Sequence, residues 1–239
     1  MSYMQITLPS RCQVYKDVQA EDITVRPYKV KDEAILSQIS PHNIEQKYLQ
    51  VMRDTVKGVD PLDLTIGDRT YIMLWAYINS YSKTDRLQTT CSHCLEPVTA
   101  VVDLNSLGLT YLPEDFKNDA TVKIEGPDGK MVTVGVRLIT VRDEIETEKY
   151  SANHKDALVY RYARTISMGD KSAREIKDWL SDCPAASLAR IRKWHEANVH
   201  GPVMLTTYEC PECEEEEQIL VPFRIEYLYP EGETLENIA

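Results

Sequence analysis

Four of the six cysteines form two Cys-x-x-Cys pairs that lie more than a hundred residues apart in the chain. Cys91 and Cys94 belong to the segment TTCSHC, and Cys210 and Cys213 belong to TYECPEC. A structural zinc ion is held by four ligands in a tetrahedron, with Zn–S distances of about 2.3 Å. Because one pair supplies only two thiolates, we predict that the two pairs together bind one structural Zn²⁺ ion.

The residues around both pairs predict β-hairpins with the cysteines at their tips. The segment RLQTTCSHCLEPVTAVVDL, at 86–104, has strand-like flanks, and the second pair leads into the β-branched segment QILV. Two such knuckles side by side form a zinc ribbon. A long insertion between them is tolerated, because the entropy cost of loop closure grows only with the logarithm of loop length.

The sequence leaves other roles for the cysteines open. His93 could replace one thiolate as a ligand. A redox pair requires a helix N-terminus and a lowered thiol pKa, whereas both pairs lie between predicted strands, and the four glutamates after the second pair would raise a thiol pKa. The cysteines could also be unligated, as we expect for Cys12 and Cys183, which fit no ligand spacing.

Hydrophobic periodicity predicts an α+β fold in which most of the helices lie outside the zinc ribbon. Helices are expected at 31–39, at 41–56 with Pro41 opening the helix and Gly58 ending it, at 65–82, and in several segments of 141–199; a hairpin is expected at 121–138. The predicted domains are a mainly helical N-terminal segment (1–85), a split zinc-ribbon module (86–112 and 200–229), an inserted β-hairpin and helical subdomain (113–199) and a tail (230–239).

Composition argues against nucleic acid and membrane partners. The 239 residues carry a formal net charge of −11, the densest acidic run is ECEEEE at 212–217, and no basic cluster offsets it. The sequence contains no stretch of about eighteen apolar residues, so we expect no membrane span. The N-terminus lacks the features of a secretory signal, so we expect a reducing cytosol, where Cys-x-x-Cys pairs are more often metal or redox sites than disulfides.

Motifs for catalysis are not found in the sequence. It contains no glycine-rich phosphate loop, no Gly-x-Ser-x-Gly and no His-Glu-x-x-His. His195, Glu196 and His200 lie close together in WHEANVH, but a spacing of five does not suit a helical metal pair, so we expect capping or solvated histidines. A zinc ion with four thiolates has no open position for water. We therefore expect a non-enzymatic protein without a small-molecule substrate.

The layout of residues 20–228 resembles the baseplate hub and hub assembly proteins of T-even-like contractile-tailed phages (myoviruses). The resemblance rests on the helix DRTYIMLWAYINSYS running directly into TTCSHC, then a hairpin, a helical insertion, CPEC and a final strand. It implies that the four cysteines occupy the knuckle positions of that family and supplies no catalytic residue. It also implies a hub component or assembly chaperone that binds other baseplate and tail proteins, in the host cytoplasm during assembly and in the virion tail.

A second function class remains open: a cellular zinc-ribbon protein in transcription or RNA metabolism. Such ribbons usually present basic residues near the knuckles, whereas Glu214–Glu217 would repel phosphate. A metal-dependent hydrolase would need an open zinc position. Tyr71 and Tyr77 could contact a partner but fit a buried helix better, and the tail YPEGETLENIA is a candidate docking segment.

Overall fold

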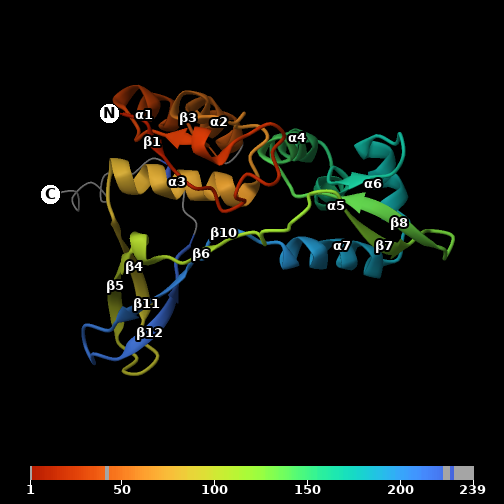
Figure 1. The fold of residues 1–239 in the computed structure, drawn as a ribbon. Coiled ribbons are helices and arrows are strands. Elements are labelled where there is room, and N and C mark those ends of the chain that lie inside the picture. The colour runs from red at the N-terminus through yellow and green to blue at the C-terminus, as the bar shows by residue number, and fades with distance from the viewer. Residues whose placement is uncertain (1, 41–42, 223–226, 229–239) are drawn as a thin grey trace.

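The computed structural model describes residues 2–40, 43–222 and 227–228, and it has a mixed α+β fold of helices and small antiparallel sheets. Figure 1 shows three parts: helices α1–α3 with a small sheet at the N-terminal end, a second lobe of helices α4–α7 with the β7–β8 hairpin, and the β4–β5 and β11–β12 hairpins extending away from α3. The predicted α+β class is confirmed.

The N-terminal lobe is built around helix α3, which is buried on most of its sides. Its apolar residues include Ile72, Met73 and Tyr77, each about 1% exposed or less, and the Thr65 hydroxyl caps the helix by accepting from the Asp68 amide at 3.3 Å. The elements of this lobe are β1 (Met4–Gln5), η1 (Ala20–Asp22), β2 (Thr24–Val25), α1 (Val30–Leu36), α2 (Ile44–Thr55), β3 (Val56–Lys57) and α3 (Ile66–Ser80).

The second lobe has a hydrophobic core of its own. Ile124 and Val134 from the hairpin pack with Ala163 and Ile191 from the helices, and the hairpin turns at Gly129, whose φ of 76° suits glycine. The elements are β7 (Ala120–Glu125), β8 (Met131–Val136), α4 (Val141–Ser151), α5 (Ala157–Ala163), β9 (Ile166–Ser167), α6 (Ala173–Ser181) and α7 (Ala185–Ala197).

Two short strands join the points where the chain enters and leaves this lobe. β6 (Leu109–Thr110) pairs antiparallel with β10 (Gly201–Pro202). The β4–β5 hairpin precedes this junction and the β11–β12 hairpin follows it. These hairpin elements are β4 (Thr84–Thr90), β5 (Pro97–Asp103), η2 (Leu104–Ser106), β11 (Leu205–Glu209) and β12 (Glu216–Leu220).

The main differences from the predicted elements are short strands. Strand β3 follows α2 directly, so the helix ends at Thr55 and not at Gly58, which instead follows the strand with a φ of 91°. β6, β9 and β10 were also not predicted, because a two-residue strand is defined by its distant partner and not by local periodicity. The predicted start of the helix at Pro41 and the tail at 230–239 lie outside the described residues.

The backbone of α3 approaches the entry to β10 very closely at Gly67. A Cβ added at Gly67 would lie 2.2 Å from the carbonyl oxygen of His200. A 2.6 Å hydrogen bond between Thr65 Oγ1 and His200 Nε2 also joins the two segments where they cross. Glycine is therefore required at this point for the strand after the second lobe to cross α3.

We predict that Gly67→Ala will destabilise the protein by about 1–3 kcal/mol, because a methyl group there must push two backbones apart. Urea unfolding of the two proteins measures the change. The matched control is Gly108→Ala, where the added Cβ would meet only the Val203 side chain at 3.7 Å. Equal stability of the Gly67 variant and the natural protein would contradict this close packing.

Candidate metal centre

Both Cys-x-x-Cys segments adopt the same backbone turn at the tip of a hairpin. The amide of Leu95 donates to the Cys91 carbonyl at 3.0 Å, and the amide of Glu214 donates to the Cys210 carbonyl at 2.9 Å. Leu95 and Glu214 each follow the second cysteine of their pair and have φ values of 63° and 61°. Two non-glycine residues in this conformation at equivalent positions indicate a turn held by its surroundings.

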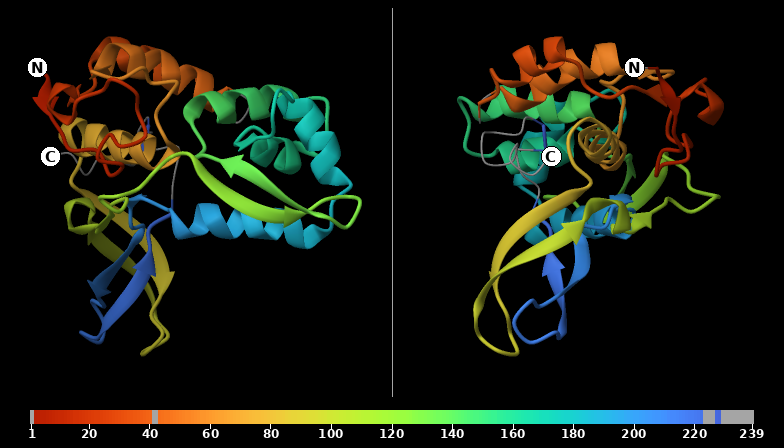
Figure 2. Two further views of the ribbon diagram at one scale, coloured as in Figure 1. Left: turned by 45° about the vertical axis from the view of Figure 1, so that its right-hand side comes forward. Right: turned by 90° about the vertical axis from the view of Figure 1, so that its left-hand side faces the viewer.

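The two hairpin tips meet, so that all four predicted ligands come together. Figure 2 shows the β4–β5 and β11–β12 hairpins side by side in both views, with their tips at the end away from the helices. The four Sγ atoms lie within 4.8 Å of one another. Cys91 and Cys213 are 3.7 Å apart at sulfur, and Cys94 and Cys210 are 3.9 Å apart.

These distances fit a tetrahedral zinc site. Four sulfurs at about 2.3 Å from one ion would be about 3.8 Å from each other, whereas a disulfide needs about 2.05 Å. Cys91 and Cys210 are fully buried, and Cys94 and Cys213 are partly buried. Within the described residues, this is the one group of His, Cys, Asp or Glu side chains with a geometry that could hold a metal ion.

Glu217, from strand β12, links the second hairpin to the first knuckle. Its Oε1 atom accepts from the Ser92 amide at 2.5 Å, from the Ser92 hydroxyl at 2.7 Å and from the His93 amide at 3.2 Å. The hydroxyl of Tyr208 donates to Oε2 at 3.1 Å. The hydrogen bonds from Ser92 are the main reason that the pKa of Glu217 is lowered to about 2.

Glu217 is the residue of this site that the sequence prediction misjudged. The run Glu214–Glu217 was expected to act as one group that repels phosphate, but Glu217 differs from the other three because it turns inward, with 11% of its side chain exposed. Strand alternation gives the reason: Glu217 lies on the same face of β12 as the buried Ile219. His93, the alternative ligand, is half exposed and lies 3.9 Å from Glu217.

The histidines of WHEANVH are more buried than predicted. His200 is 9% exposed and bonds to Thr65, and His195 lies 3.2 Å from the Thr165 hydroxyl. Burial is the main cause that lowers the pKa of His195 to about 4, with the charges of Arg161 and Arg137 adding to it. His200 joins the two lobes through Thr65 and also lies 3.1 Å from the carbonyl oxygen of Asn198, the C-cap residue of α7. His195 bonds inside the second lobe. Neither histidine is solvated, whereas the expected capping holds for His200.

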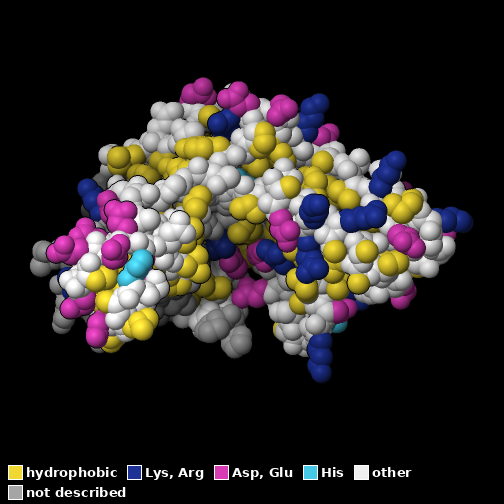
Figure 3. Space-filling view, turned by 90° about the horizontal axis from the view of Figure 1, so that it is seen from below, with side chains coloured by type: hydrophobic (Ala, Val, Ile, Leu, Met, Phe, Trp, Pro, Cys, Tyr) yellow, Lys and Arg dark blue, Asp and Glu magenta, His cyan; other side chains and the backbone are white. Residues whose placement is uncertain are grey.

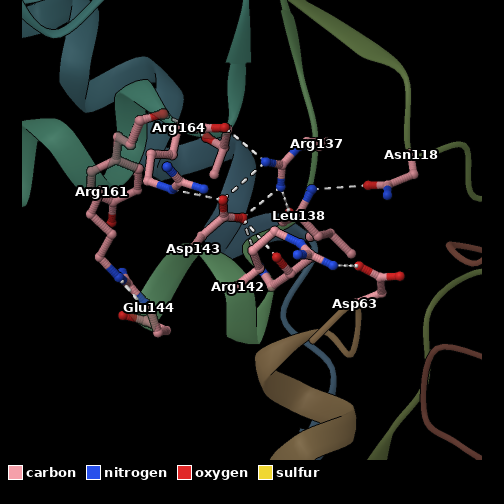
Figure 4. Close-up of polar contacts among 12 residues, drawn as sticks. Asp63, Asn118, Arg137, Leu138, Arg142, Asp143, Glu144, Arg161 and Arg164 are labelled. Carbon is pink, nitrogen blue, oxygen red and sulfur yellow. Dashed lines mark hydrogen bonds and ion pairs between the residues drawn. The ribbon is translucent and has the colours of Figure 1, made fainter. Parts of the chain in front are cut away.

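A dense set of ion pairs joins the second lobe to the loops beside it (Figure 4). Asp143, which is fully buried, accepts from Arg137 at 2.6 and 3.0 Å and from Arg164 at 3.0 Å. Burial alone would raise the pKa of Asp143, but the hydrogen bonds and charge of Arg137 outweigh it and lower the pKa. Nearby, Arg161 pairs with Glu144. This cluster has no unpaired acid or base suited to catalysis among the residues that Figure 4 labels.

The fold and the site together define an α+β protein with two cysteine pairs at the tips of hairpins that precede and follow the second lobe. A family model described as T4 bacteriophage base plate protein matches residues 2–228, and the chain therefore belongs to this family. Neither the curated proteins nor the solved structures gave a significant match to the sequence. No helix within the described residues is long and apolar enough to cross a membrane.

We predict that Glu217→Ala will lower the unfolding free energy by about 1–2 kcal/mol, because the donors of Ser92 and Tyr208 lose a charged acceptor. Urea unfolding tests this, with Glu216→Ala, an exposed neighbour on the same strand, as the control. Equal destabilisation by both substitutions would show that Glu217 does not brace the first knuckle.

Stability should fall as the pH drops from about 6.5 to 4, because unfolded histidine binds a proton near pH 6.5 while folded His195 stays neutral until about pH 4. His195→Gln should remove on the order of 2 kcal/mol of this acid dependence. Thermal unfolding between pH 7 and pH 4 measures it, and His154→Gln serves as the control. An unchanged pH profile in the His195 variant would refute the assignment.

Proposed function

We propose that this protein is a non-enzymatic structural or assembly component of a contractile phage tail baseplate, stabilised by one structural zinc ion. The observation that carries the zinc proposal is the approach of four cysteine sulfurs from opposite ends of the inserted lobe to within 4.8 Å. Family membership supports the baseplate role. It does not favour the alternative of a cellular protein of transcription or RNA metabolism.

Cys91, Cys94, Cys210 and Cys213 would hold the zinc ion. Bound zinc would neutralise part of the thiolate charge and fix the two knuckles to each other. This link would add to the packing of both hairpins in the shared core, because an isolated two-stranded hairpin is at best marginally stable in water. Structural zinc sites couple metal binding directly to folding, and four thiolates suit a structural ion better than a catalytic one.

The domain division that we propose follows from the meeting of the two hairpins. The two hairpins (86–112 and 200–229) form one split module, and the lobe at 113–199 is an insertion whose ends meet at the β6–β10 pair. The insertion has its own core, centred on Ile124 and Val134. An inserted lobe on a metal-fixed base would present a separate contact surface to other tail proteins.

The charge distribution supports a role in protein contacts. Residues 200–239 contain ten acidic residues and one basic residue, whereas 113–199 contain fifteen of each. From below, Figure 3 shows acidic side chains spread over the hairpin end, while Lys and Arg gather on the inserted lobe. An acidic end beside a lobe of balanced charge favours oriented contacts with neighbours in an assembly. In finer detail, we propose that the chain is a hub subunit or a chaperone of hub assembly, and that it is located in the virion tail.

Zinc content tests the metal proposal. We expect about one zinc per chain in protein purified without chelators, measured by elemental mass spectrometry. Cys94→Ser and Cys213→Ser should each lose the metal and melt at lower temperature, whereas Cys183→Ser, outside the site, should keep both. A natural protein free of zinc after growth with zinc, or a Cys94 variant that retains it, would refute the proposed site.

Genetic depletion tests the assembly role. Infected cells that lack this chain should produce tails without complete baseplates, visible by electron microscopy, and the natural chain supplied in trans should restore them. Normal baseplates in its absence would exclude the assembly role. Retention on DNA at low salt would favour the transcription alternative instead.

A further inference from the structure

A groove lies on the surface where helix α2 of the N-terminal lobe meets helix α4 of the second lobe. Figure 1 shows the two helices next to each other at the boundary between the lobes. The groove has a volume of about 350 Å³, and its lining residues come from α2, from the loop before α3 and from α4. A ligand bound there would therefore contact both lobes.

The floor of the groove is apolar. Leu49 of α2 and Ile145 of α4 belong to the hydrophobic core and are 9% and 6% exposed. Leu62, which precedes α3, packs against the same core and is partly exposed. Because the core holds these side chains in place, the groove forms without a ligand, and its floor can accept an apolar side chain.

The sides of the groove carry more positive than negative charge. Three basic residues and one acidic residue line it: Arg53 on α2, and Arg142, Lys149 and Glu146 on α4. The whole chain has a formal net charge of −11, so the charge of this groove is opposite to that of the molecule. Since both helices contribute a cation, a ligand in the groove would meet positive charge on each side.

Arg53 makes no ion pair within the part of the chain that the structure describes. It lies in the last turn of α2, and its side chain is exposed. The neighbouring carboxylate, Asp54, pairs with Lys31 instead. The guanidinium of Arg53 can therefore bind a carboxylate of a ligand without losing a partner in the chain.

The two cations of α4 are paired, but only at the surface. Arg142 Nη2 donates to Asp63 at 2.9 Å and lies 4.0 Å from Asp60. Lys149 donates to Glu146 at 2.8 Å. The side chains of these pairs are between 40% and 56% exposed. Because exposed ion pairs contribute little free energy, a carboxylate of a ligand can share or replace them.

The number of cations favours an acidic protein segment over a nucleic acid. A phosphate backbone gains its affinity from many cations along its length, whereas three line this groove. The carboxylates of Asp54, Asp60 and Asp63 are exposed beside them and would repel further phosphates. A segment with one apolar side chain between two acidic residues instead matches an apolar floor with a cation on each side.

We propose that the groove between α2 and α4 binds a segment of another protein in which an apolar side chain of the size of leucine lies between two acidic residues. The apolar side chain would contact Leu62 on the floor. One carboxylate would pair with Arg53, and the other with Arg142 or Lys149. This proposal adds a contact site to the baseplate role but does not depend on it or on zinc.

Short peptides test the groove by NMR titration of the full chain. The probes are Ac-Gly-Glu-Leu-Glu-Gly-NH2, a version with Gln in place of both Glu residues, and a version with Ala in place of Leu. We expect the first peptide to cause saturable shifts confined to residues 46–53, 60–63 and 142–149. Each altered peptide should bind about threefold more weakly or worse, because it loses the exposed ion pairs or part of the buried apolar surface.

Charge reversal on α2 separates binding in the groove from general attraction. Arg53→Glu breaks no ion pair of the described chain and should weaken binding of the Glu peptide about threefold or more. The matched control is Lys47→Glu, which lies on the same helix but does not line the groove, and it should leave binding unchanged. Lys149→Gln breaks only an exposed pair and should also weaken binding about threefold. It serves as the test if the Arg53 variant does not fold.

Three results would overturn the proposal. The first is equal binding of the Glu and Gln peptides, or of the Leu and Ala peptides. The second is an unchanged affinity of the Arg53 variant, or of the Lys149 variant where the former does not fold. The third is a clear gain in affinity when the chain is shortened to residues 1–228. The occupant would then be the chain's own C-terminal segment, which contains Glu231, Glu233 and Glu236.

Discussion

The meeting of two hairpin tips is the constraint on which the rest of the architecture depends. The chain leaves α3 through the β4–β5 hairpin, forms the second lobe, and then forms the β11–β12 hairpin. Each hairpin has only two strands, and the β6–β10 pair that joins them holds two residues on each side. Such small sheets are marginal alone. The two ends are connected by buried apolar residues of both hairpins, such as Val98 and Ile219, and by the bonds of Glu217. The four sulfurs also approach one another there. A metal ion at this point would fix the lobe relative to the N-terminal helices.

An arginine–aspartate pair organises each of two parts of the chain that share one order of elements, β1-β2-α1-α2-β3 and β7-β8-α4-α5-β9. Arg26 and Asp32 are 3% and 1% exposed, and such a pair gains little net stability because both charges lose their hydration. Its value is geometric: the arginine joins the middle strand, the start of the first helix and the entry to the third strand through one planar group. The second unit repeats this arrangement with Arg137 and Asp143, and adds Arg164 as a second cation.

The two ends of the molecule differ in charge and in the contacts that they make. The hairpin end is acidic and holds the four cysteines of the two pairs, whereas the second lobe balances its charges and meets the N-terminal lobe through polar contacts at His200, Thr65 and Arg142. Residues 2–228, which include both ends, match the T4 bacteriophage base plate protein family.

The sequence by itself determined the α+β class, the helices at α3, α6 and α7, the β7–β8 hairpin and the grouping of four cysteines, because periodicity, caps and Cys-x-x-Cys spacing are local signals. It could not determine the two-residue strands, since each exists only through a partner far along the chain. Only the tertiary structure decided that Glu217 turns toward Ser92 and that His200 is buried against Thr65. The orientation of Glu217 depends on which face of its strand meets the other hairpin, and the burial of His200 depends on where the chain crosses α3. Both are determined by packing between distant segments and not by either segment alone.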